Sequence, residues 1–219
     1  MKSALVIAGP SAVGKTTVAE KIIEISGGGF ELSRSLTTRQ RRGDAFDDEY
    51  IYTTREGFEK ELSNGRVLEH TEYSGELYGT PLSEIERISD SGKTPILILD
   101  LNGVKNVSQR ADALKICAVY LYCDNETLQK RLYSRYLCSG FTEEGEKMMK
   151  KRLEENRRYN SVIGDFTDCF YDFLDNNGTP LSTAERILSV FFEFASGKAK
   201  DGKKNSEVAE NIRLSAKSE

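Results

Sequence analysis

One eight-residue segment near the start of the chain limits its fold more than any other. Residues 9–16 read Gly-Pro-Ser-Ala-Val-Gly-Lys-Thr, which matches the pattern G-x-x-x-x-G-K-[ST]. The run Ser3–Ala8 before it is short and apolar, and Thr17–Ile25 after it carries apolar residues at helical spacing. A glycine-rich turn between a buried strand and a helix directs backbone N–H groups and the helix N-terminus at one point, which suits a phosphate. The segment therefore predicts a phosphate-binding loop in an α/β fold.

The residue types within this loop have distinct expected roles. Lys15 is expected to reach the β- and γ-phosphates of a nucleoside triphosphate, and the Thr16 hydroxyl to face Mg²⁺. The residues expected to bind the triphosphate are Gly9, Pro10, Ser11, Ala12, Val13, Gly14, Lys15, Thr16 and Thr17. The alternative is a chance match in an ordinary strand–turn–helix, which the fitting context on both sides argues against.

Length, charge and cysteine usage exclude several classes of protein. A chain of 219 residues allows one large α/β domain with insertions or at most two small domains, and a formal net charge of −4 is atypical of a nucleic-acid binder. The four cysteines form no C-x-x-C motif and there is one histidine, so free thiols in a reducing compartment are expected rather than a zinc site. The apolar run before Gly9 is too short for a signal peptide or a membrane span. We expect a cytoplasmic protein without membrane or nucleic-acid partners.

Further apolar runs alternate with helical patterns along the chain. Strands are expected at 95–99, 116–122 and 169–174, and helices at 127–137, 143–159 and 182–194. This alternation predicts a doubly wound parallel sheet, with the ligand site beyond the carboxyl ends of its strands. Residues 196–219 have few large apolar side chains and are expected to form a disordered tail, with a terminal helix over 205–214 as the alternative.

The stretch 30–91 breaks this alternation because it is polar and rich in Arg, Glu, Tyr and Gly. Guanidiniums and phenols gathered at one place suit a phosphomonoester, which accepts forked N–H donors and hydroxyl donors. The residues concerned are Arg39, Arg41, Arg42, Tyr50 and Tyr78.

A base can be recognised in the same stretch. A buried carboxylate such as Glu69 needs donors, and guanine offers its N1–H and exocyclic amine side by side, whereas adenine has no donor at N1. Hydroxyls such as Ser35 and Thr80 could complete the recognition by donating to an oxygen. Such a site rejects the wrong base because its own polar groups would stay unpaired.

These motifs resemble the guanylate kinases, a family of P-loop nucleoside monophosphate kinases, from about Ser3 to about Phe194. The most specific element is the S-x-T-T-R segment at Ser35–Arg39, and the others are the loop at 9–16, Leu68-Glu69, Tyr78-Gly79-Thr80 and residues 100–104. The resemblance implies a parallel-sheet core with an inserted GMP-binding subdomain and a helical lid. The expected domain spans 1–195, with core segments 1–32, 93–125 and 160–195, a GMP-binding insertion at 33–92 and a lid at 126–159.

The resemblance also implies an activity, which is ATP-dependent phosphorylation of GMP and dGMP by in-line transfer with Mg²⁺. By this likeness Arg39, Arg42, Tyr50 and Tyr78 hold the phosphate of GMP. Guanine is then recognised by Glu69, Ser35 and Thr80, and Asp100 lies near the guanine amine and, with Thr16, near the metal. Arg131 and Arg135 bind ATP from the lid, and the catalytic set is Lys15, Arg39, Arg135 and Arg152. The protein is expected to be a monomer or a homodimer.

The chain departs from the family pattern at several positions. Arg41 stands where proline is common, so Arg41 and Arg42 could exchange roles. Ile98 replaces an aspartate, which leaves Thr16, Asp100 and the phosphates to hold the metal. In the lid, Asn156 and Tyr159 replace an alanine and a glutamate.

Two other functions stay open. One is a non-catalytic guanylate-kinase-like interaction module, which the intact Lys15 and Thr16 argue against. The other is a kinase for a different nucleotide, including a modified guanylate.

Overall fold

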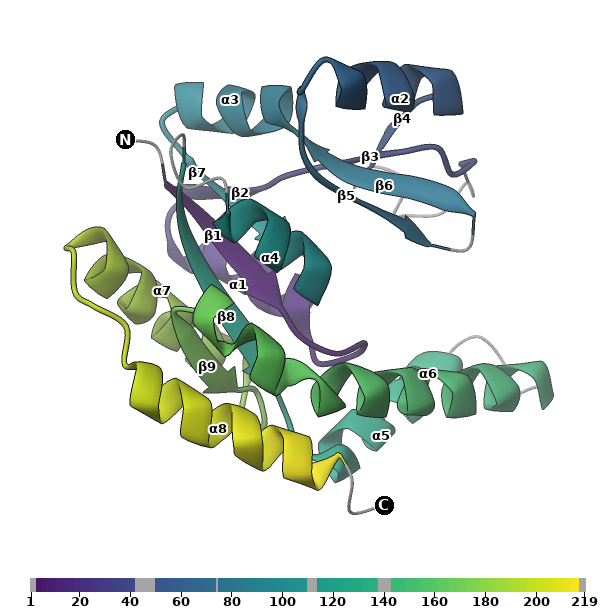
Figure 1. Cartoon of the computed structure of the whole chain (residues 1–219). Helices are drawn as coiled ribbons and strands as arrows, with labels where there is room; N and C mark the ends of the chain where they lie inside the picture. Colours follow the sequence, from purple (N-terminus) through teal and green to yellow (C-terminus); the bar gives the residue numbers. More distant parts are fainter. Residues whose placement is uncertain (1–2, 42–49, 74, 110–113, 138–142, 217–219) are drawn as a thin grey trace. The chain divides into compact units, whose positions relative to one another are not determined.

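The structure is a computed structural model that describes residues 3–41, 50–73, 75–109, 114–137 and 143–216 (Figure 1). The chain divides into two units, which are described separately. The first contains Met1–Val6 and Ile23–Ile116, and the second contains Ile7–Ile22 and Cys117–Glu219. Strand β1 (Ser3–Ala8) and helix α1 (Lys15–Ile25) contribute residues to both units.

Five strands form a sheet with the order β2-β7-β1-β8-β9. Besides β1 they are β2 (Phe30–Leu32), β7 (Thr94–Ile98), β8 (Lys115–Tyr122) and β9 (Asp172–Asp175). The β2–β7 and β8–β9 pairs are parallel. Residues 4–8 of β1 are fully buried, as expected of a strand covered on both faces, and this explains the continuous apolar run in the sequence. The predicted α/β fold with a parallel-sheet core is confirmed.

One predicted strand is wrong over its first half. A strand was expected over 169–174, but Cys169 is the last residue of the 3₁₀ helix η2 (Ile163–Cys169), and β9 begins only at Asp172. Apolar residues are buried on both sides of this boundary, because Ile163 in η2, Phe170 between the two elements and Phe173 in β9 are each at most 2% exposed. Burial alone therefore does not separate the helical turn from the strand.

The first unit contains a second sheet with the order β4-β3-β6-β5. Its strands are β3 (Ser35–Thr37), β4 (Tyr50–Tyr52), β5 (Val67–Tyr73) and β6 (Glu76–Pro81). The β3–β4 pair is parallel, and β6 runs antiparallel to both β3 and β5.

Three helices accompany these strands in the first unit: α2 (Arg55–Ser63), α3 (Leu82–Asp90) and α4 (Leu101–Ser108). Helix α2 begins at the Thr54 cap, whose side chain accepts a hydrogen bond from the Gly57 N–H. Its Phe58 is fully buried with Leu36, Val67 and Leu77, which gives the second sheet a small core of its own.

The second unit carries the remaining helices α5 (Asn125–Leu137), α6 (Glu143–Ser161), α7 (Pro180–Ala195) and α8 (Gly202–Ser215). The first three agree with the predicted helices within two residues at each end. No helix in the described part of the chain has the length and apolar character to cross a membrane.

Helix α8 corrects the expectation of a disordered tail over 196–219. It begins at the Asp201 cap, whose side chain accepts from the Lys204 N–H, and it packs on η2, α6 and β9 (Figure 1). Ala209 and Ile212 are 1% and 7% exposed. The buried face is made of small and polar residues as well as isoleucine, which is why composition did not reveal it.

Candidate functional site

The glycine-rich loop connects β1 to α1, as the sequence predicted. Gly9 and Gly14 have φ angles of 148° and 103°, a region that other residues rarely adopt. A Cβ at Gly9 would also collide with the carbonyl oxygen of Leu121. Lys15 Nζ donates to the carbonyl oxygens of Gly9 (2.8 Å) and Pro10 (3.0 Å), so its ammonium group is held against the loop backbone.

Asn156 of α6 binds this loop through both ends of its amide. The Ser11 N–H donates to Asn156 Oδ1 at 2.7 Å, and Asn156 Nδ2 donates to the Ser11 carbonyl oxygen at 3.0 Å. Asn156 is only 4% exposed. The sequence marked this residue as a departure from the family but did not assign it a contact.

A second pair of residues holds the loop at Val13. Arg131 Nη1 and Asn176 Nδ2 donate to the Val13 carbonyl oxygen at 2.8 and 2.7 Å, and Arg131 Nη2 donates to the Asn176 carbonyl oxygen at 2.7 Å. Asn176 Oδ1 accepts from Thr183 Oγ1 at 2.7 Å. Arg131 therefore lies beside the predicted phosphate-binding loop, where it contacts backbone oxygens.

Of the other two predicted lid arginines, Arg152 has described side-chain contacts and Arg135 has only a described backbone. Arg152 lies on α6, one turn before Asn156, and its Nη1 donates to Glu155 at 3.1 Å. The backbone of Arg135 belongs to α5, but its side chain lies outside the described part of the structure.

A cluster of tyrosines surrounds Arg39 in the first unit. The Arg39 guanidinium lies 4.8 Å from the centroid of the Tyr50 ring, and its Nη2 donates to the Tyr52 hydroxyl at 3.0 Å. The Tyr50 and Tyr78 rings meet edge to face with centroids 6.1 Å apart. The guanidinium of Arg41 lies 4.6 Å from the Tyr52 ring. The structure thus brings together Arg39, Tyr50 and Tyr78, whereas Arg42 lies outside the described residues.

Tyr52 belongs to this cluster although it was not among the predicted site residues. Strand residues two apart share a face, so Tyr50 at the start of β4 already indicated that Tyr52 lies on the same side. That periodicity was the available signal. Ser35, the predicted hydroxyl, pairs with Tyr50 in the β3–β4 register.

Glu69 forms a second polar cluster with Thr80 and Asp100. It is 7% exposed, and Thr80 Oγ1 donates to its Oε1 at 2.6 Å. Burial raises the pKa of Glu69, the Thr80 hydrogen bond opposes this, and the nearby Asp100 carboxylate raises the pKa further. The Thr80 proton is directed at Glu69, so its hydroxyl oxygen is the part that faces other partners as an acceptor. This differs from the expectation that Thr80 donates to a base oxygen.

The closeness of Glu69 to helix α4 depends on a glycine. A Cβ at Gly103 would lie 3.2 Å from both Glu69 Oε2 and Asp100 Oδ1, which is tighter than ordinary contact. Asp100 Oδ1 caps α4 by accepting from the Gly103 N–H at 2.6 Å.

The two predicted metal ligands supply oxygen atoms, Thr16 a hydroxyl in the first turn of α1 and Asp100 a carboxylate at the start of α4. They belong to different units. No group of three or more His, Cys, Asp or Glu suited to a metal occurs among the residues that the structure describes. Oxygen ligands in small number fit Mg²⁺, which usually keeps several waters and binds mainly through substrate phosphates.

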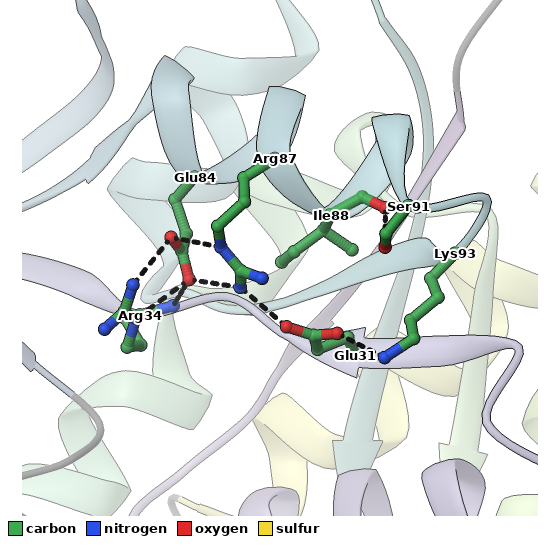
Figure 2. A network of polar contacts seen from close by, with 7 residues as sticks. All are labelled: Glu31, Arg34, Glu84, Arg87, Ile88, Ser91 and Lys93. Atoms are coloured by element: carbon green, nitrogen blue, oxygen red, sulfur yellow. Dashed lines mark hydrogen bonds and ion pairs between the residues drawn. The ribbon is translucent and has the colours of Figure 1, made fainter.

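Ion pairs anchor the segment that leads into β3 (Figure 2). Arg34, directly before Ser35, donates from Nε and Nη2 to the Glu84 carboxylate of α3 at 3.0 and 3.2 Å. Arg87 donates to the same carboxylate and to Glu31, which also pairs with Lys93. Burial alone would raise the pKa of Glu84, but hydrogen bonds from Arg87 and Arg34 outweigh it and lower the pKa to about 2.

Comparison with known proteins agrees with these features. The guanylate kinase family model matches residues 1–179. Guanylate kinases of Lactobacillus delbrueckii subsp. bulgaricus and Streptococcus thermophilus are 33% and 34% identical over 190 and 191 residues, which is 85% of this chain and 86% and 84% of theirs. The crystal structure of guanylate kinase from Anaplasma phagocytophilum superposes with a TM-score of 0.61 at 22% identity, covering 98% of this chain and 96% of that one, and it supports the fold.

The matched residues include the loop at 9–16, the tyrosine cluster around Arg39, and Glu69 with its partners. On the extent of this match and the identity to the bacterial relatives, the chain belongs to the guanylate kinase family.

Proposed function

We propose that the protein transfers the γ-phosphoryl group of ATP to GMP, giving ADP and GDP, and accepts dGMP in the same way. The observation that carries the proposal is the intact loop with Lys15 and Thr16 in a chain of this family. A non-catalytic interaction module has no need of a lysine and a hydroxyl at these positions. The proposal places the protein in purine nucleotide metabolism in the cytoplasm, as a monomer or homodimer without nucleic-acid or membrane partners.

On the donor side, the loop N–H groups and Lys15 bind the β- and γ-phosphates. Arg131 adds positive charge beside the loop and holds Val13 in place, as its hydrogen bonds to the Val13 and Asn176 carbonyl oxygens indicate. Thr16 and Asp100 are the residues that would hold Mg²⁺, which supplies charge neutralisation on the phosphates.

On the acceptor side, Arg39, Arg42, Tyr50 and Tyr78 bind the phosphate of GMP. The ring cluster around Arg39 supports this assignment, because it gathers a cation and phenol donors on one sheet. Tyr52 fixes the direction of the Arg39 guanidinium through its hydroxyl.

Recognition of guanine rests on the buried carboxylate of Glu69. It accepts from the N1–H and the exocyclic amine of the base, with Asp100 close to the same amine and Ser35 and Thr80 completing the polar contacts. The hydrogen bond between Thr80 and Glu69 supports this role because it orients a carboxylate that is itself only 7% exposed.

The transfer is in line. An oxygen of the GMP phosphate attacks the γ-phosphorus as the bond to the β–γ bridging oxygen breaks. The acceptor oxygen is already ionised near neutral pH, so no general base is needed, and catalysis comes from positioning and charge stabilisation. Lys15, Arg39, Arg135 and Arg152 stabilise the charge on the transferred group.

The proposal is tested by measuring ADP release with ATP and Mg²⁺ and, in parallel, GMP, dGMP, AMP, CMP or UMP. We expect turnover with GMP and dGMP, and little with the other three. Lys15→Ala should lower kcat by about a hundredfold or more while GMP still binds, because the charge on the transferred phosphoryl is no longer stabilised. Lys21→Ala on the same helix is the matched control and should stay active.

Three results would count against the proposal. Absence of turnover with any guanine nucleotide would exclude the kinase activity, and full activity of Lys15→Ala would exclude the assigned loop role. Equal turnover of AMP and GMP would exclude the role of Glu69 in base selection.

A further inference from the structure

The glycine-rich loop contains one residue in an unfavourable backbone conformation. Ala12 has a φ of +63°, and it is the non-glycine residue with positive φ in the described part of the chain. In the left-handed region the Cβ comes close to the following carbonyl group. Alanine therefore pays a steric free-energy cost in this conformation, whereas glycine, which has no Cβ, does not. A loop with alanine at this position needs contacts elsewhere to hold its shape.

Asn156 supplies such contacts at the peptide groups next to Ala12. Its Nδ2 binds the carbonyl oxygen of Ser11, which belongs to the peptide bond between Ser11 and Ala12. Its Oδ1 accepts from the N–H of the same Ser11. Both groups of Ser11 are therefore fixed by one side chain, and the peptide plane that leads into Ala12 cannot rotate without breaking a hydrogen bond.

The amide of Asn156 is well placed to keep this geometry. Asn156 is 4% exposed and Ser11 is half-buried, so water competes little on the asparagine side of these two hydrogen bonds. An asparagine side chain carries an acceptor oxygen next to an NH2 donor group, which matches the N–H and C=O of a single residue.

We propose that Asn156 is a positioning residue that holds the phosphate-binding loop in the strained conformation that Ala12 requires. This inference rests on the proposed function in so far as the loop binds ATP. It also links the loop to α6, the helix that carries Arg152 one turn earlier. Helix α6 therefore carries Arg152 and also contacts the loop through Asn156.

The test compares Asn156→Ala with Asn160→Ala. Asn160 lies one turn further along α6, is 8% exposed, and accepts from the Tyr120 hydroxyl at 2.7 Å, so it is a buried asparagine of the same helix with no role in the loop. Asn156→Ala should raise KM for ATP by about tenfold or more, because two hydrogen bonds that preorganise the loop are lost. KM for GMP should change little, and Asn160→Ala should leave KM for ATP unchanged.

Amide hydrogen exchange gives a readout that does not depend on turnover. The Ser11 amide should be protected in the wild-type chain and in Asn160→Ala, and should lose protection in Asn156→Ala. Asn156→Asp keeps an acceptor for the Ser11 N–H but loses the donor to its carbonyl oxygen. It should therefore retain Ser11 protection and show an intermediate KM for ATP, and it also serves if Asn156→Ala does not fold.

Removing the strain should remove the need for Asn156. Glycine adopts positive φ without a Cβ penalty, so Ala12→Gly combined with Asn156→Ala should recover most of the affinity for ATP that Asn156→Ala loses. A double variant as impaired as Asn156→Ala would overturn the link between the asparagine and Ala12.

The outcomes separate this inference from the proposed function. If the wild-type chain turns over GMP while Asn156→Ala matches Asn160→Ala in KM for ATP and in Ser11 exchange, the inference is wrong and the function stands. If the wild-type chain shows no turnover, the function is wrong. The role of Asn156 is then decided by Ser11 exchange and by direct titration with Mg²⁺-ATP, where unchanged values in Asn156→Ala overturn it.

Discussion

At the level of single residues, the buried carboxyl group of Glu69 combines a proposed role in base recognition with a cost in stability. Its pKa is raised above the ordinary 4.5 by burial, with Thr80 opposing and Asp100 adding to the rise. Between the ordinary and the raised pKa the folded chain binds more protons at this site than the unfolded chain. The free energy of unfolding therefore falls as the pH rises through that interval. Above this raised pKa the ionised carboxylate destabilises the fold, and the proposed recognition of a base would be its functional gain.

Glu69→Gln should accordingly have opposite effects on stability and activity. Gln keeps an oxygen to accept from Thr80 but carries no buried charge, so the free energy of unfolding at pH 7 should rise by about 1 kcal/mol. Its amide group presents a donor where guanine also presents donors, so kcat/KM for GMP should fall by about a hundredfold. Thermal unfolding and steady-state kinetics on the same preparation measure both effects.

Glu72→Gln provides the matched control on the same strand. Glu72 is exposed and lies 3.6 Å from Arg55 in a surface ion pair, so its neutralisation should leave stability and activity nearly unchanged. A Glu69→Gln variant that turns over GMP like the wild-type chain would contradict the assigned recognition.

Residue roles differ in how far the sequence predicts them. The loop at 9–16 was predicted because its glycines and Lys15 follow a fixed spacing. Asn156 and Tyr52 were not predicted as contacts. Asn156 binds Ser11, which is distant in the sequence, and Tyr52 binds Arg39, which the pairing of β3 with β4 brings near it. Ser11 and Asn156 are 145 positions apart, and no local pattern records that distance.

At the level of elements, the charged network in Figure 2 ties α3 to the segment before β3. Glu84 is 3% exposed and accepts from Arg34 and from Arg87, whose side chains are each 45% exposed. Because α3 follows β6 directly, this carboxylate connects the strand that carries Tyr78 and Thr80 with the one that begins at Ser35.

Glu84→Gln should lower the free energy of unfolding at pH 7 by about 2 kcal/mol, since two arginines lose a charged acceptor. The pKa of Glu84 is lowered from 4.5 to about 2. Its contribution is therefore fully present above pH 4.5 and is lost as the pH falls through about 2. The difference between wild type and variant, measured by urea unfolding, should shrink over that interval.

The exposed Glu86 of α3 gives the control. Glu86→Gln should change the free energy of unfolding by less than about 0.5 kcal/mol at any of these pH values. A Glu84→Gln variant whose deficit stays constant from pH 4.5 down to pH 2 would show that the network does not titrate as described.

Element prediction succeeded where strands and helices alternate along the chain and failed inside the polar stretch 30–91. Strand β1 and helix α7 were predicted from their apolar residues, and α5 and α6 as charged helices between apolar runs. Helices α2 and α3 were not predicted inside the polar stretch, because few apolar positions anchor each one. The core of α2 depends chiefly on Phe58, and that of α3 on Ile85 and Ile88.

At the level of the whole molecule, helix α8 belongs to the unit that contains the phosphate-binding loop. Asn205, 1% exposed, donates from Nδ2 to the carbonyl oxygen of Tyr171 at 3.1 Å, and Ala209 is buried one turn later. The end of the described chain is therefore part of the folded structure of this unit, in contact with η2, α6 and β9.

Ala209→Asp should lower the free energy of unfolding by about 2–4 kcal/mol, because it places an unpaired charge in a buried position. Ser206→Asp introduces the same residue on an exposed position of the same helix and should have little effect. Thermal unfolding of the two variants makes the comparison. Equal midpoints would mean that α8 does not support the fold.

The left-handed conformation of Ala12 also constrains the order in which substitutions accumulate in a lineage. On the proposed role of Asn156, a chain with glycine at position 12 tolerates more residues at position 156 than a chain with alanine there. Replacing asparagine at 156 should then cost less ATP affinity in a chain that has glycine at 12. Among relatives, alanine at position 12 should therefore occur together with asparagine at position 156.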